Sequence, residues 1–180
     1  MKALARKLRN AEGAEIAEAA LVMPVVFIFL LGIIWFGRAF NIYSTIQQAA
    51  QQGAITAARA SCATCGNAFP LDGPITTPGT VTYAVAAVMK ASSLDPGQII
   101  ANPLPVPGCS VTSKITICRQ VLLNPPPPPG PLQTCLPVSQ PQICGTQVSF
   151  QYPFTFYLPF TSLNLSQVVM TAQAQSRMEN

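Results

Sequence analysis

The sequence contains no histidine and few acidic residues, and both shortages exclude classes of function. Without histidine, serine–histidine and cysteine–histidine catalysis are excluded, and so is a histidine-ligated metal site. Beyond residue 18 the only acids are Asp72, Asp95 and Glu179, each beside a turn or near the end of the sequence. A paired-carboxylate site is therefore not expected. No glycine-rich phosphate loop is present either. We expect no enzyme, no cofactor, no metal and no small-molecule substrate.

The basic residues are too dispersed to form a nucleic-acid-binding surface. Four of the ten lie in the first nine residues, at Lys2, Arg6, Lys7 and Arg9. The other six are scattered between residues 38 and 177, without the interleaved aromatic residues of a nucleic-acid site. The net charge of +4 therefore reflects mainly the N-terminal segment, and nucleic acid is not an expected partner.

What the sequence has in abundance is an uninterrupted apolar run near its N-terminus. No charged residue falls between Glu18 and Arg38, and these nineteen residues would span about 28 Å as a helix, roughly one hydrocarbon core. The run is too long for an ordinary cleaved secretory signal. The basic residues before it predict a cytoplasmic N-terminus and an extracytoplasmic remainder. We expect a single-pass membrane protein with its span at about residues 19–37.

A carboxylate lies at the edge of this run, and the need for a membrane anchor does not explain it. Charged residues at such positions are costly and commonly functional. Gly13 precedes Glu18 by five residues, and Gly-x-x-x-x-Glu at the head of an apolar helix resembles the processing signal of type IV prepilins. The fuller pattern resembles the TadE-like pilus assembly family: Gly13-x-x-x-x-Glu18-x-Ala20-Leu21-x-x-Pro24, then Gly32-Ile-Ile-Trp-Phe-Gly37-Arg38-Ala39. A Tyr152-Pro153-Phe154 segment and the apolar–polar tail are similar to the same family.

The resemblance implies a minor pilin or pseudopilin of the Tad (type IVc) pilus or a related secretion apparatus, and hence a role in cell adhesion. It implies a prepilin peptidase that cuts between Gly13 and Ala14, with other pilins and assembly platform proteins as partners. The location implied is the bacterial inner membrane, or a surface pilus. An uncleaved single-pass anchor that displays an extracytoplasmic binding domain is the alternative that the sequence leaves open.

The residues with expected roles in assembly are Glu18, Glu15 and Pro24. After cleavage Ala14 carries a new amino group, and Glu18 lies one helical turn away, so the pair is expected to set axial register in a helical bundle. Glu15 is a second carboxylate that competes for the same amine. Pro24 removes one backbone donor and is expected to bend the helix.

The helix is expected to continue well beyond the membrane, to about Arg59. Apolar residues recur at three- and four-residue steps and form one stripe, at Phe40, Tyr43, Ile46, Ala50, Ala54 and Ala57. The stripe has two candidate partners, which are the C-terminal domain of the same chain and the same helix in neighbouring subunits. The expected organisation is a basic leader at 1–13, the long helix at 14–60 and an extracytoplasmic domain at 61–180.

Six cysteines follow the membrane span, and an even number in an exported domain is typical of disulfides. Sequence alone allows fifteen pairings. The shortest loops pair Cys62 with Cys65, Cys109 with Cys118, and Cys135 with Cys144. A redox or half-zinc reading of Cys62-x-x-Cys65 lacks the βαβ context or the second ligand pair that it needs.

The remaining pattern predicts an α+β, pilin-like fold with a second, shorter helix and a short antiparallel sheet of three or four strands. The helix is expected at 81–93, with Thr80 as N-cap and an apolar face of Tyr83, Val85, Ala86, Val88 and Met89. Strands are expected at 111–122, at 147–157 and within 163–178, with a weaker one in 99–106. Residues 124–131 are proline-rich and predict a rigid surface loop. The two helices are the available cover for the sheet.

Overall fold

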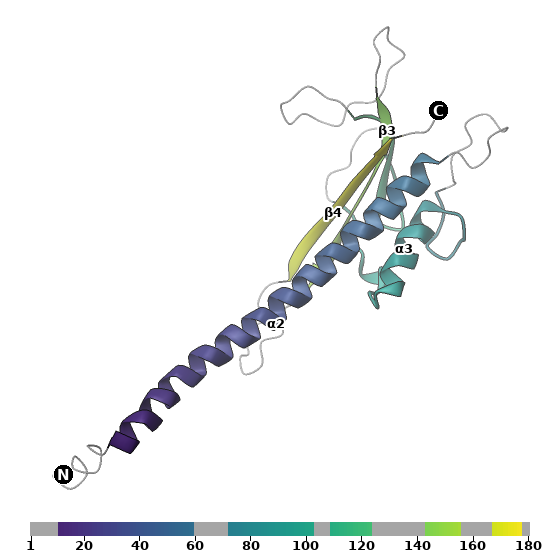
Figure 1. Ribbon diagram of the computed structural model, residues 1–180. Coiled ribbons are helices and arrows are strands. Elements are labelled where there is room, and N and C mark those ends of the chain that lie inside the picture. Colours follow the sequence, from purple (N-terminus) through teal and green to yellow (C-terminus); the bar gives the residue numbers. More distant parts are fainter. Residues whose placement is uncertain (1–10, 60–71, 103–108, 124–142, 156–166, 178–180) are drawn as a thin grey trace. The chain divides into compact units, whose positions relative to one another are not determined.

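The computed structural model describes residues 11–59, 72–102, 109–123, 143–155 and 167–177 (Figure 1). The expected leader, the proline-rich loop, and Cys62, Cys65 and Cys135 lie outside these residues. The elements follow in the order α2 (Ala11–Ala58), α3 (Val81–Ala91), the short 3-10 helix η1 (Pro96–Gln98), β1 (Cys109–Thr112), β2 (Ile115–Leu122), β3 (Cys144–Phe154) and β4 (Val168–Arg177). Two helices and a four-stranded antiparallel sheet confirm the predicted α+β class. The chain divides into two units, residues 1–40 and 41–180, with the division inside α2.

The first unit is described from residue 11 and is helical throughout. The helix includes Ala11, the first described residue, and passes through Pro24 without interruption. Its large apolar side chains are exposed: Leu21 at 74%, Phe36 at 78% and Phe40 at 72%. Large apolar side chains thus lie on the surface of this part of the helix.

The second unit contains the sheet, whose strands follow their order in the chain, β1-β2-β3-β4. Each neighbouring pair is antiparallel, and β3 and β4 pair along ten residues, from Gly145 with Arg177 to Phe154 with Val168. The register between β2 and β3 shifts between Cys118 and Val121, where Gln120 has a φ of 56°. Ile100 makes an isolated bridge to Gln151, within the segment where a weak strand was expected.

The prediction of a single strand at 111–122 is wrong, because this segment forms the β1–β2 hairpin. Thr112 pairs with Ile115, which leaves a two-residue turn at Ser113 and Lys114. Their φ angles of 50° and 66° are both positive, as in the turns whose twist matches a tight hairpin. Serine and lysine are not the usual residues of such a turn, so the alternating pattern concealed it.

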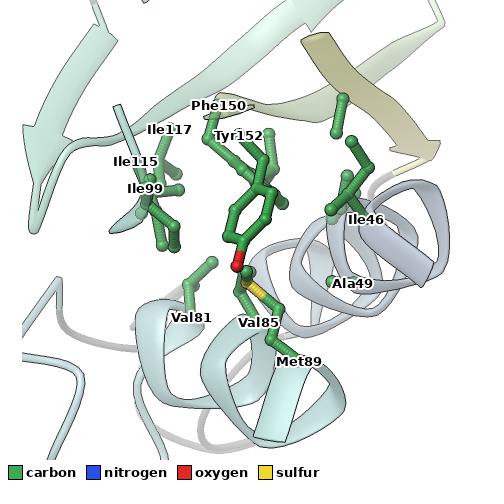
Figure 2. Packing of buried hydrophobic residues seen from close by; sticks show 14 of the residues in the cluster. Ile46, Ala49, Val81, Val85, Met89, Ile99, Ile115, Ile117, Phe150 and Tyr152 are labelled. Atoms are coloured by element: carbon green, nitrogen blue, oxygen red, sulfur yellow. The ribbon is translucent and has the colours of Figure 1, made fainter. Parts of the chain in front are cut away.

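The core of the second unit lies between one face of the sheet and two helical segments, α3 and residues 46–58 of α2. Figure 2 shows Ile46 and Ala49 of α2, and Val85 and Met89 of α3, directed toward Phe150 and the rest of the sheet residues. Of the expected stripe, the four residues from Ile46 to Ala57 are fully buried. Phe40 and Tyr43 are not, at 72% and 45% exposure. The chain's own domain is therefore the partner of the stripe from Ile46 onward.

A glycine allows α2 to approach the sheet closely. A Cβ at Gly53 would lie 2.6 Å from Cγ2 of Val85 and 3.3 Å from Cγ1 of Val148, so the site has no room for a side chain. A hydrogen bond also joins α2 to β3 here: the Thr146 hydroxyl donates to the carbonyl oxygen of Ala54 at 3.0 Å. Both groups are buried, where an unmade hydrogen bond is costly.

The second helix begins where the sequence predicted. The hydroxyl oxygen of Thr80 accepts a hydrogen bond from the backbone N–H of Tyr83 at 3.2 Å, which is the geometry of an N-cap. The buried face consists of Val81, Thr82, Val85, Ala86 and Met89. The prediction that Tyr83 belongs to this face is wrong: its side chain is 40% exposed. The buried stripe follows steps of four residues from Val81, and Tyr83 lies off that line.

Candidate functional site

The predicted processing and register residues all lie at the head of α2. Gly13 and Ala14 lie near Ala11, where the described part of this helix begins. Ala14 and Glu18 are four residues apart in the helix, which places them on one face with a rise of about 6 Å. Glu18 is exposed, and its side chain forms no ion pair with any described residue.

The segment after Glu18 has the properties of a membrane anchor or pilin helix. In the described part of the chain, α2 is the one helix that is long and apolar enough to cross a membrane. None of its most apolar window is buried within the protein. Pro24 lies in this segment. A Cβ added at Gly32 or Gly37 would have no atom within 4 Å, so both glycines lie on open helix surface.

The uncharged run ends at a pair for which the sequence had suggested no role. The guanidinium carbon of Arg38 lies 5.8 Å from the centroid of the Trp35 ring, within the range of a cation–π contact. The two residues are three apart in α2, a spacing at which helical side chains meet. That spacing was visible in the sequence and is the signal that could have found the pair.

In the second unit, Cys109 and Cys118 form a disulfide. They are direct partners in the β1–β2 register, with Cα atoms 4.2 Å apart. This is one of the pairs that the shortest loops suggested. Cys144 is also disulfide-bonded. No group of three or more potential metal ligands occurs among the described residues.

One ion pair in the second unit was missed by sequence reasoning. Nη2 of Arg119 donates to Oδ1 of Asp72 at 2.8 Å, and Nη1 donates to Oδ2 at 3.1 Å. The Ser110 hydroxyl donates to the same Oδ2 at 2.5 Å. The three groups join the segment before α3 to the β1–β2 hairpin, and the bidentate geometry is typical of a strong pair. Because the partners are 47 residues apart, no local pattern could have indicated this contact.

The buried titratable group of the second unit is Tyr152. Its hydroxyl donates to Oε1 of Gln98 at 3.4 Å, and the side chain is 4% exposed. Burial raises the pKa of Tyr152; a backbone hydrogen bond at Asp95 opposes this shift, and the Asp95 charge adds to it. A raised pKa keeps the phenol neutral at physiological pH. Its burial against the core residues assigns the Tyr152 ring to packing.

Comparison with known proteins identifies the N-terminal segment. Residues 13–54 match the family model described as TadE-like protein. No curated protein and no solved structure matches the chain. The matched segment starts at Gly13, includes the whole apolar run and ends one residue after Gly53, in the buried part of α2. Proteins of this family take part in pilus assembly and are not catalytic. The likeness to the TadE-like family is therefore shown over residues 13–54 of this chain.

Proposed function

We propose that this protein is a minor pilin or pseudopilin that takes part in assembly of a Tad (type IVc) pilus or a related secretion apparatus. The observation that carries the proposal is the family match, which begins at Gly13, the residue just before the proposed cut. The match runs on through Glu18 and the apolar run of α2. The match thus starts at the proposed cut and covers the N-terminal part of the chain that would remain after the leader is removed.

Processing is proposed to occur between Gly13 and Ala14, by a prepilin peptidase at the cytoplasmic surface. A peptidase binds its scissile bond in an extended form, and a glycine before that bond has no side chain to obstruct it. Glycine in a helix is also less stable than alanine by about 1 kcal/mol. The position of Gly13 therefore keeps the bond accessible while the rest of the helix stays intact.

Register is proposed to come from Glu18 after cleavage. The new ammonium group of Ala14 lies one turn from the Glu18 carboxylate, on the same face of α2. In a bundle of such helices each carboxylate pairs with an ammonium group, its own or a neighbour's. Breaking such a pair in an apolar bundle strands a charge at a cost of about 3–5 kcal/mol, so misregistered packing is penalised. Glu15 comes three residues earlier in the sequence, nearer the leader, and is proposed to be the weaker competitor for the amine.

The exposed apolar surface of residues 21–36 supports a helix that changes its surroundings. Lipid covers it before assembly, and helices of other pilins cover it afterwards. Gly32 and Gly37, which lie on open surface, are suited to close helix–helix approach. The proposed partners are accordingly other pilins and the proteins of the assembly platform.

The test compares two carboxylates in cells that produce the machinery. Glu18→Ala is expected to be inserted and cleaved normally but to fail in pilus assembly and in co-purification of partner pilins. Glu15→Ala is the matched control, with the same loss of charge three residues earlier, and is expected to be milder. Normal piliation with Glu18→Ala, or a stronger defect with Glu15→Ala, would contradict the assigned role.

The cleavage itself has a separate test. N-terminal sequencing of the membrane-bound protein is expected to begin at Ala14. Replacing Gly13 with a bulky residue is expected to retain the leader and slow migration on a gel. An intact leader in both proteins, with an active peptidase present, would favour the uncleaved anchor that displays a binding domain.

A further inference from the structure

The outer end of the apolar run carries a cation with no counter-ion in its part of the sequence. Arg38 is the first charged residue after Glu18, and no acidic residue occurs between Glu18 and Asp72. Its guanidinium lies over the ring of Trp35, which is the single tryptophan of the protein. Arg38 is exposed and forms no ion pair with any described residue. Its charge is therefore available to an anion outside the described residues.

The distance between the two charged ends matches a bilayer. Arg38 is twenty positions after Glu18, which in a helix corresponds to a rise of about 30 Å, the thickness of a hydrocarbon core. The side chains between them face outward, with Phe27 at 60% and Ile33 at 69% exposure. When Glu18 lies at one surface of a membrane, the pair of Trp35 and Arg38 therefore lies at the other.

The direction of the arginine side chain determines what it can contact there. Side chains of an α-helix lean toward its N-terminus, so Arg38 leans back over Trp35 and toward the apolar run. The guanidinium is thus held at the depth of the lipid headgroups instead of reaching into water. The indole face replaces part of its hydration, and its planar N–H groups match the oxygens of a phosphodiester. Tryptophan itself prefers this boundary.

We propose that Trp35 and Arg38 form a phospholipid-binding site in the leaflet opposite the leader. Arg38 binds a lipid phosphodiester and Trp35 lies at the headgroup boundary, so the depth of α2 in the membrane is fixed. The inference rests on the membrane anchorage in the proposed function. Fixing the depth of Arg38 also fixes the depth of Glu18 at the opposite end of the apolar run. Ala14 then lies about 6 Å beyond Glu18 on the leader side, at the surface where a peptidase acts.

The single tryptophan makes depth directly measurable in the full-length protein. The protein is reconstituted in phospholipid vesicles whose acyl chains carry bromine either near the glycerol or near the chain end. Shallow bromine is expected to quench Trp35 fluorescence more strongly than deep bromine. In Arg38→Ala the ratio of shallow to deep quenching is expected to fall at least twofold, and Arg38→Lys is expected to lie between the two. Arg59→Ala removes another exposed arginine and is expected to match the wild type.

Three outcomes would overturn the proposal. The first is a wild-type Trp35 quenched most strongly by deep bromine. The second is an unchanged ratio in Arg38→Ala. The third is an unchanged ratio when the wild type is placed in phosphate-free brominated glycolipid, since the phosphodiester would then have no role. These results are separate from processing: a deep Trp35 in a correctly cleaved protein contradicts this inference alone. Absence of quenching at either depth contradicts the membrane anchorage and the proposed function with it.

Discussion

The two parts of α2 differ in the size of their side chains and in what covers them. Before residue 40 the helix carries large apolar residues such as Phe27, Phe29 and Phe36, all at least 60% exposed. After residue 45 it carries alanines and Gly53, and its buried face contacts α3 and the sheet. The first part is apolar on all sides, whereas the second is apolar along one stripe and carries four glutamines beside it, at Gln47, Gln48, Gln51 and Gln52. Small residues allow the backbone to pack within its own domain, whereas large residues form a surface that suits lipid or other helices.

Truncating the same residue type in each part of α2 tests whether the two parts differ in burial. Ile46 is fully buried and Ile33 is 69% exposed. Ile46→Ala is expected to lower the free energy of unfolding by about 2–5 kcal/mol, because it loses apolar burial and leaves a cavity. Ile33→Ala is expected to change it by less than about 0.5 kcal/mol. The measurement is urea unfolding of the detergent-solubilised protein, followed by circular dichroism. Equal effects would mean that the two parts are not covered differently.

A second change acts only on the unit that contains the sheet. Replacing Cys109 and Cys118 together by alanine removes the link between β1 and β2, whose partners are nine residues apart. We expect a loss of about 2–3 kcal/mol, because the unfolded chain regains the freedom that the loop had removed. Thermal unfolding measures the change, and thiol titration of the unreduced wild type is expected to find no free thiol. Six titratable thiols in the native protein would contradict the disulfide assignment.

Two glycines of α2 distinguish the effect of close packing from the effect of helix propensity. Gly53→Ala gains helix propensity but forces a methyl group against Val85, so we expect a net loss of up to about 2 kcal/mol. Gly37→Ala meets no atom and is expected to be neutral or to gain up to about 1 kcal/mol. Urea unfolding of the two variants provides the comparison. A stabilised Gly53→Ala protein would show that the helix does not approach the sheet this closely.

The smallest expected effect is a pH dependence confined to the second unit. Burial holds the pKa of Tyr152 above its ordinary value of 10.0. The unfolded chain therefore loses this proton at a lower pH than the folded protein does. The stability contributed is complete below about pH 10 and is lost as the pH rises through the folded pKa.

The check is the thermal midpoint measured across this pH range. The midpoint is expected to fall more steeply above pH 10 in the wild type than in Tyr152→Phe, which keeps the ring and removes the titrating hydroxyl. Parallel pH profiles for the two proteins would assign the alkaline loss to other groups.

Much of the fold could be predicted because its signals are local. Thr80 was identified as an N-cap from its place before an apolar face, and the capping hydrogen bond confirms it. The β1–β2 hairpin was not, because Ser113 and Lys114 adopt positive φ angles without the glycine or asparagine that normally indicates them. Tyr83 was misplaced for a different reason, since a helix as short as α3 offers more than one plausible apolar face.

Some features of the candidate site were visible in the sequence, and others appeared only in the folded structure. The run without charge, the spacing of Gly13 and Glu18 and the family match all lie within one continuous segment, so the sequence alone determined them. The pairing of Cys109 with Cys118, the contact of Asp72 with Arg119 and the point at which α2 becomes buried were decided only by the tertiary structure. Each depends on strand register or on packing between residues distant in the chain. Such contacts form only when the whole domain buries its apolar surface together, so no single segment contains them.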